Sequence, residues 1–181
     1  MTTEETIEIR RIRSTDAAYA FVRQLLTTSF PPEEYRDLKE WERYTDEKEE
    51  FHNQVIVAQD KPIGLFSYWD FGAFAYGEHF AIDPQCRNHG YGRKVIEAIC
   101  KQLNKPLVLE VEMPDNELAR RRIEFYRRQG FQLWESPYQQ PPYQAGYPTL
   151  PMYLMAYGDI EEKEFDSVTR IIHREVYGVR S

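Results

Sequence analysis

The chain has 181 residues, of which 41% are hydrophobic, enough for the core of one α/β domain with little room for a second. The formal net charge is -7 and no basic stripe dominates, so we expect no nucleic-acid partner. No apolar run approaches the roughly 18 residues that span a bilayer, and the polar start MTTEETIEIR resembles no secretory signal. Cys86 and Cys100 lack the spacing of a zinc site. We therefore expect a cytoplasmic protein with free thiols, no metal and no membrane contact.

The first fifty residues predict one strand and two helices. Three isoleucines within 7–12 indicate the strand. The Ser-Thr-Asp sequence at 14–16 can cap a helix over 17–28, which the prolines at 31–32 end. A second helix is predicted over 33–44.

The middle of the chain changes from a helical to a strand-like period. Strands are predicted over 54–59, 62–71 and 76–83. An apolar stripe of helical spacing follows over 95–103. Residues 106–113 are almost continuously apolar, which is typical of a buried central strand.

The last third predicts a helix, two strands and a final helix. The first of these helices covers 116–129. Strands are expected over 131–134 and 150–157, with a loop rich in proline and tyrosine between them. Asp159 and Glu162 have the spacing of a capping box that opens the final helix.

The segment HFAIDPQCRNHGYGRKVIEAI joins a strand to a helix through a loop that contains glycines. Gly90 and Gly92 permit positive φ and carry no Cβ that would block a ligand. The N–H groups of the first helical turn and the helix dipole favour an anion there, and Arg87 and Arg93 add positive charge. The segment therefore predicts a pyrophosphate site.

Two common nucleotide-binding motifs do not fit this loop. A dinucleotide fingerprint needs a third glycine where Val95 stands, and no P-loop string is present. An ordinary strand-to-helix loop remains the alternative interpretation of the two glycines alone.

The wider pattern resembles a known family. The motif Arg87-x-x-Gly90-x-Gly92, after a strand that closes in Ile-Asp-Pro, resembles motif A of the GCN5-related N-acetyltransferase (GNAT) superfamily. The later string RIEFYRRQGF resembles motif B, which typically ends F-Y-x-x-x-G-F. The resemblance in element order covers about residues 6–157. It implies an enzyme that moves an acetyl group from acetyl-CoA to a primary amine, with a small molecule as the expected acceptor.

The resemblance also implies the architecture. We expect a single mixed, mostly antiparallel sheet of about seven strands flanked by helices, the acyl-CoA N-acyltransferase fold. The acetyltransferase domain would cover residues 1–158. Residues 159–181 would form a C-terminal helical extension, packed on the same domain or at the contact of a homodimer.

The resemblance places acetyl-CoA along one strand and one loop. The backbones of Phe80 and Ile82 would pair with the pantetheine arm, as an added strand pairs with an open sheet edge. The loop would hold the pyrophosphate, and its residues implied as cofactor-binding are Arg87, Asn88, His89, Gly90, Tyr91, Gly92 and Arg93. Many members carry an asparagine seven residues before the motif B tyrosine, where this sequence has Ala119; Asn116 lies out of helical register.

Two residues match the family's catalytic positions. Tyr126 would be the general acid toward the departing thiolate, although its spacing with Ile123 also fits a core tyrosine. Glu78 would be the general base, for which a carboxyl pKa of about 4.3 is too low unless burial raises it or water relays the proton. Strand alternation puts Glu78 on the face of Phe80 and leaves His79, the alternative candidate for the base, on the other, unless a bulge breaks the phase.

The family usually builds its acceptor pocket from the turn between the first two helices and the loop between the last two strands. Here those segments hold the expected substrate-binding residues Phe30, Glu34, Tyr138 and Tyr143. An aromatic and acidic lining suits a cationic amine. The alternative for these two segments is that they are surface connections stiffened by proline. The alternatives for the function are a catalytically silent acyl-CoA-binding module and an acetyltransferase of protein N-termini or lysines.

Overall fold

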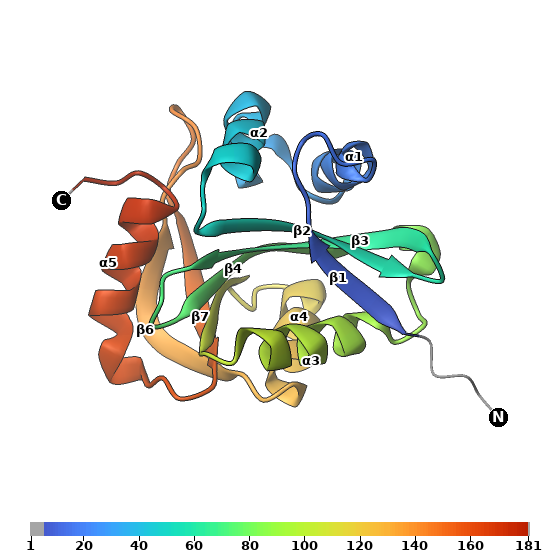
Figure 1. Cartoon of the computed structure of the whole chain (residues 1–181). Helices are drawn as coiled ribbons and strands as arrows, with labels where there is room; N and C mark the ends of the chain where they lie inside the picture. The colour runs from blue at the N-terminus through green and yellow to red at the C-terminus, as the bar shows by residue number, and fades with distance from the viewer. Residues whose placement is uncertain (1–5, 181) are drawn as a thin grey trace.

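The computed structural model describes residues 6–180, which form a seven-stranded sheet with helices on both faces (Figure 1). The strand order is β1-β2-β3-β4-β5-β7-β6. Neighbouring strands are antiparallel except β4 and β5, which are parallel. The fold class expected from the sequence, including the added C-terminal helix, is confirmed.

The elements have the following bounds. The strands are β1 (Ile7–Arg11), β2 (Phe51–Ala58), β3 (Lys61–Asp70), β4 (Ala75–Ile82), β5 (Leu107–Glu112), β6 (Gln132–Gln140) and β7 (Leu150–Tyr157). The helices are α1 (Tyr19–Ser29), α2 (Leu38–Glu47), α3 (Tyr91–Leu103), α4 (Glu117–Arg128) and α5 (Phe165–Glu175). Short 3₁₀ turns cover Pro32–Glu34, Pro84–Cys86 and Glu162–Glu164.

The helices bury their apolar stripes in two core layers, one on each face of the sheet. Leu26 of α1, Trp41 of α2 and Ile172 of α5 belong to one layer. Ile96 of α3 and Ile123 of α4 belong to the other. Figure 1 shows α1 and α2 above the sheet and α3 and α4 below it. We call these sides the α1/α2/α5 face and the α3/α4 face.

Both N-terminal helices begin later than the sequence predicts. The Asp16 carboxylate pairs with Arg10 and accepts a hydrogen bond from the Ala18 amide, so the turn before α1 continues to Tyr19. Before α2, residues 32–34 form a separate 3₁₀ turn. Asp37 then caps α2, because its carboxylate accepts hydrogen bonds from the first amides of this helix.

The C-terminal third differs from the prediction in two places. Strand β6 extends to Gln140 instead of ending at 134, with a register shift between Trp134 and Tyr138. It is an edge strand, where a proline is tolerated because half of its backbone needs no ladder partner. The capping box forms between Glu161 and Glu164, two residues later than predicted, because Glu162 instead accepts hydrogen bonds from residues 135 and 136 of β6.

Within residues 6–180, no helix combines the length and the apolar character that crossing a membrane requires. The same residues contain no group of three or more His, Cys, Asp or Glu side chains that could hold a metal ion.

Candidate active site

Strands β4 and β5 pair over only part of their length. The parallel ladder joins Ala75–Gly77 to Leu107–Leu109. Beyond these residues β4 stays paired with β3 as far as Ile82, and β5 stays paired with β7 as far as Glu112. The described residues add no further β4–β5 pairs. The sheet therefore opens between the ends of these two strands, and the backbone edge of β4 is left for a ligand that can pair as a strand does.

The glycine loop ends beside this opening, at the start of α3. Gly90 is the residue before the helix and has a left-handed φ of 75°. A Cβ at Gly90 would meet nothing within 4 Å, so the glycine is needed for its backbone angle. Gly92 lies inside the helix without a positive φ, and a Cβ there would touch the Phe125 ring at an ordinary 3.6 Å. Of the two glycines, Gly90 therefore uses the positive φ that glycine permits, whereas Gly92 does not.

The first turn of α3 presents main-chain donors. Helix geometry leaves the amides of Gly92 and Arg93 without an acceptor inside the helix. The Arg87 Nε donates to the Ile82 carbonyl at 3.3 Å, and Arg93 pairs with Glu97 on the exposed surface at 2.9 Å. The loop thus combines helix-terminal donors with two guanidinium groups, as a diphosphate site requires.

Strand β4 carries a bulge at Glu78. Ser67 of β3 pairs with His79, and the next residue, Tyr68, pairs with Gly77, so Glu78 has no partner on β3. The one extra residue shifts the pleat of β4 by one step.

The bulge decides which side chains share a face. Glu78 and His79 both lie on the α1/α2/α5 face, where they contact the segment between α1 and α2. Phe80 and Ile82 pack in the layer of α3 and α4. The expectation that Glu78 shares the face of Phe80, opposite His79, is therefore wrong.

The Glu78 carboxylate is bound by four donor atoms. Arg36 approaches in a bidentate manner, with Nη1 to Oε1 at 3.1 Å and Nη2 to Oε2 at 2.6 Å. Trp69 Nε1 donates to Oε1 at 2.9 Å, and the Tyr143 hydroxyl donates to Oε2 at 2.8 Å. The Arg36 and Glu78 side chains are 3% and 0% exposed. This carboxylate is a saturated, buried acceptor.

The pKa of Glu78 follows from these contacts. Burial alone would raise it, but the charge and hydrogen bonds of Arg36 and the bond from Trp69 lower it below the ordinary glutamate value. A general base needs a raised pKa and a free lone pair. The environment of Glu78 therefore does not favour the predicted role, which stays a prediction.

His79 lies beside this ion pair. Its Nε2 is 2.8 Å from the main-chain oxygen of Glu34, and the residue is 4% exposed. The Phe30 ring meets the imidazole edge-on with centroids 4.9 Å apart, and the Tyr143 ring stacks on it at 6.0 Å. The structure thus brings three of the predicted acceptor residues, Phe30, Glu34 and Tyr143, together around Glu78 and His79.

The two predicted acceptor segments also contact each other. Gln144 Nε2, in the β6–β7 loop, donates to the main-chain oxygens of Pro32 at 3.3 Å and Tyr35 at 3.1 Å. Burial, and then the nearby charge of Glu112, raise the pKa of Glu34. The predicted acceptor side is therefore acidic, partly aromatic and enclosed by two joined loops.

The acetyltransferase (GNAT) family model matches residues 16–131, about two thirds of the chain. The chain belongs to this family. The predicted enzyme class, an N-acetyltransferase that uses acetyl-CoA, is thereby confirmed. Among curated proteins, none matches the sequence.

Solved structures of acetyltransferases share the fold. A putative GNAT acetyltransferase from Bacteroides thetaiotaomicron is 48% identical, with a TM-score of 0.93 over 96% of this chain and 99% of its own. An aminoglycoside 6'-N-acetyltransferase in complex with coenzyme A is 15% identical, with a TM-score of 0.64 over 85% of this chain and 98% of its own. The ribosomal-protein-S18-alanine N-acetyltransferase from Escherichia coli is 20% identical, with a TM-score of 0.58 over 84% of this chain and 93% of its own. The last two similarities concern the fold alone.

In this GNAT protein, the motif B tyrosine, Tyr126, lies on α4 in the α3/α4 layer. Its ring contacts Phe125 and Phe131 edge-on, with centroids 5.1 Å and 5.3 Å away. Burial raises the pKa of Tyr126 to about 12, so the hydroxyl keeps its proton at neutral pH, as an acid must. Asn116 caps α4 by accepting a hydrogen bond from the Ala119 amide at 2.8 Å, which explains its place outside the helical register.

The GNAT fold places Tyr138 differently from the prediction. It lies in β6 rather than in the loop, is 2% exposed, and donates a hydrogen bond to Glu110 of β5. The Glu110 carboxylate also accepts from Gln140 at 2.6 Å and from Tyr177, after α5, at 2.7 Å. Burial raises the pKa of Glu110, and the hydrogen bonds that its carboxylate accepts offset this only in part. Tyr138 therefore belongs to the core and not to the loop of the predicted acceptor side.

Sequence reasoning missed four polar or aromatic groups of this GNAT site: Arg36, Trp69, Glu110 and Tyr177. Glu110 left a signal, because an acidic residue inside an apolar central strand needs buried donors. The other three give no local signal, since their partners come from distant elements.

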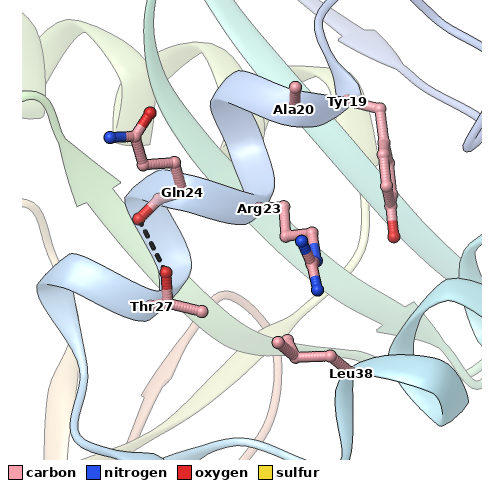
Figure 2. Close-up of a pocket in the computed structure, with 6 residues that line it drawn as sticks. All are labelled: Tyr19, Ala20, Arg23, Gln24, Thr27 and Leu38. Atoms are coloured by element: carbon pink, nitrogen blue, oxygen red, sulfur yellow. Dashed lines mark hydrogen bonds between the residues drawn. The ribbon is translucent and has the colours of Figure 1, made fainter.

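A separate cavity of about 380 Å³ lies on the surface of this GNAT chain between α1 and α2 (Figure 2). It is lined by Tyr19, Ala20, Arg23, Gln24, Thr27 and Leu38. None of these residues belongs to the predicted site.

Proposed function

We propose that this acetyltransferase moves the acetyl group of acetyl-CoA to a primary amine of a small molecule. The opening between β4 and β5, next to the first turn of α3, carries the proposal. The backbone of Phe80 and Ile82 would pair with the pantetheine amides. The amides of Gly92 and Arg93, with Arg87 nearby, would hold the pyrophosphate. A structure of the same fold is a complex with coenzyme A, which supports the choice of cofactor.

The reaction is direct attack by the amine. The nitrogen lone pair forms a bond to the acetyl carbonyl carbon, and the C–S bond then breaks to release the thiolate of CoA. We assign Tyr126 as the donor of a hydrogen bond to the departing sulfur. A thiol has a pKa of about 8.5 and Tyr126 one of about 12, so stabilisation by the hydrogen bond, rather than complete proton transfer, is its contribution.

The acceptor side favours a small cationic amine. The Glu34 carboxylate supplies negative charge, and Phe30 and Tyr143 supply aromatic surface around His79, whose ring contacts the Glu34 main chain. The bonds of Gln144 to the Pro32 and Tyr35 carbonyls hold the two loops together, which leaves an extended peptide little access between them. Acetylation of protein termini or lysines is the second candidate.

Titration calorimetry with acetyl-CoA, free CoA and NAD tests cofactor choice. We expect micromolar or tighter binding of both CoA species and none of NAD. Equal binding of NAD, or no binding of CoA, would contradict the assignment of the loop and the strand opening.

A thiol-release assay with polyamines, aminoglycosides, amino sugars, amino acids and a basic peptide tests the acceptor. Turnover with a small amine supports the proposal. Turnover with the peptide alone would favour protein acetylation, and binding of acetyl-CoA without turnover would indicate a silent module. We further propose a cytoplasmic enzyme, and sedimentation would decide between a monomer and a homodimer.

A further inference from the structure

His79 has a ring tautomer that its contacts define. Nε2 lies 2.8 Å from the Glu34 carbonyl oxygen, which can only accept a hydrogen bond, so Nε2 must carry the hydrogen. In a neutral imidazole the other nitrogen, Nδ1, then has a free lone pair. Nδ1 is buried and has no hydrogen-bond partner among the described residues.

Nδ1 is one of seven buried side-chain nitrogen or oxygen atoms that have no hydrogen-bond partner among the described residues. Leaving such an atom unsatisfied is destabilising, and most buried polar atoms in proteins have a partner. Here the atom belongs to the residue that follows the bulge, at the place where β4 parts from β5. A ligand that donates a hydrogen bond at this place would satisfy it.

Burial keeps the imidazole of His79 neutral against the pull of some of its neighbours. Its own strand contributes Glu78, and the segment between α1 and α2 contributes Arg36 and the Glu34 carbonyl. The remaining neighbours are the Phe30 ring and the Tyr143 ring with its hydroxyl. Burial outweighs these contacts and lowers the pKa of His79, so the base form is present at neutral pH.

We propose that Nδ1 of His79, rather than the carboxylate of Glu78, accepts the proton of the attacking amine. This inference rests on the proposed function and deepens it. As the amine nitrogen bonds to the acetyl carbon, its N–H proton moves to Nδ1 and gives an imidazolium. The C–S electrons leave with sulfur, which Tyr126 stabilises. The products are the amide and CoA, and the imidazolium returns its proton to water or to the thiolate.

Glu78 has a positioning role in this scheme. Its four donors fix the bulge that turns His79 toward the acceptor loops. Its negative charge, next to His79 in the chain, stabilises the imidazolium once it forms.

Steady-state kinetics of His79→Gln against His52→Gln tests the proposal. His52 is the matched control, because burial also lowers its pKa, to about 4, while its ring stacks on Tyr68 with centroids 4.5 Å apart. We expect His79→Gln to lower kcat at least about 100-fold with acetyl-CoA affinity unchanged, and His52→Gln to keep wild-type kinetics. The acidic limb of the wild-type pH profile should lie below the ordinary histidine pKa of about 6.5 and should vanish in His79→Gln.

A second measurement uses the wild-type enzyme and therefore tests the proposal even if His79→Gln does not fold. Nitrogen-15 NMR of labelled wild-type enzyme should show Nδ1 of His79 unprotonated at neutral pH, gaining a proton at the midpoint of the acidic limb. A protonated Nδ1, a different midpoint, or a folded His79→Gln enzyme with normal kcat would overturn the proposal. In each of these cases wild-type turnover would leave the acetyltransferase function standing. Absence of acetyl-CoA binding by wild type would instead remove the proposed function itself.

Discussion

Arg36 and Glu78, 42 residues apart in the sequence, form a bidentate ion pair with almost no exposed side-chain surface. The pair joins the segment between α1 and α2 to the bulge in β4. The Arg36 guanidinium also lies over the rings of Tyr44 and Tyr143, at 5.0 Å and 5.3 Å. Removing one partner of such a pair leaves an uncompensated buried charge.

We therefore predict that Arg36→Met lowers the free energy of unfolding by about 3–5 kcal/mol at pH 7, measured by urea denaturation. The pKa of Glu78 is lowered in the folded wild type, so its stabilising contribution is present above the unfolded pKa of about 4.3. It is lost as the pH falls through the folded value. The difference between variant and wild type should accordingly shrink below about pH 4.

Arg93→Met is the matched control for this prediction. Arg93 pairs with Glu97 on α3, but its side chain is 72% exposed. The effect should stay within about 0.5 kcal/mol at any pH. A similar decrease in the free energy of unfolding in both arginine variants would show that the buried Arg36–Glu78 pair contributes no more to stability than an exposed pair.

Gly90→Val should abolish binding of acetyl-CoA in calorimetry. The left-handed φ of Gly90 disfavours valine, so the amides at the start of α3 would lose their alignment. Gly72→Val is the control, because Gly72 also has positive φ and an open Cβ position but lies in the β3–β4 turn. If Gly90→Val keeps its affinity for acetyl-CoA, or if Gly72→Val loses as much, the diphosphate does not bind at the Gly90 loop.

Tyr126→Phe should reduce kcat about 10²–10³-fold and leave the affinity for acetyl-CoA unchanged, because only the donor to the leaving sulfur is removed. Tyr157→Phe is a control on β7, since its ring packs against the same Phe131 at 5.4 Å. Thiol-release kinetics at saturating amine measures both variants. A normal kcat in Tyr126→Phe would show that Tyr126 has only a structural role in the core.

Glu34→Gln should raise KM for a cationic amine about tenfold, which corresponds to about 1.4 kcal/mol of binding free energy. Its neighbour Glu33 is exposed, and Glu33→Gln should leave KM unchanged. The pKa of Glu34 is raised by burial, so the wild-type KM should increase as the pH falls through that value. A KM that is equal in both variants would mean that the amine does not contact Glu34.

Tyr177→Phe should lower the free energy of unfolding by about 1.5–3 kcal/mol, because the hydroxyl donates to the buried Glu110 carboxylate. Thermal or urea denaturation measures the loss. Tyr147→Phe offers a comparison at an exposed tyrosine of the β6–β7 loop and should have no effect. A neutral Tyr177→Phe would mean that Glu110 finds its donors elsewhere.

The sequence predicted the fold well because its strongest signals were local. The Gly90 loop and the Phe125–Phe131 string fixed the order of strands and helices around them. The extent of β6 was missed because Pro137 reads as a loop residue, whereas an edge strand accommodates it. The late starts of α1 and α2 depend on single carboxylates, Asp16 and Asp37, whose partners the sequence does not specify.

The candidate site was predictable only in part. The resemblance to the family's motifs implied Tyr126, and the family's usual acceptor segments implied Phe30, Glu34 and Tyr143, while the glycine loop was visible in the sequence itself. The face of Glu78 could not be derived, because a bulge is a property of how two strands pair. The burial of Arg36 could not be predicted either, because its partner Glu78 lies on a strand more than forty residues later in the sequence.

The bulge in β4 also constrains how this protein can be changed. Substitutions in the stretch from Gly77 to Ile82 exchange one side chain for another, but deleting a single residue there would cancel the extra step against β3. Every position on one side of the deletion would then exchange inner for outer orientation. The number of residues in this strand, more than their identity, determines which side chains face the proposed site of the amine. Engineering of acceptor preference should therefore alter the two loops and keep the strand length fixed.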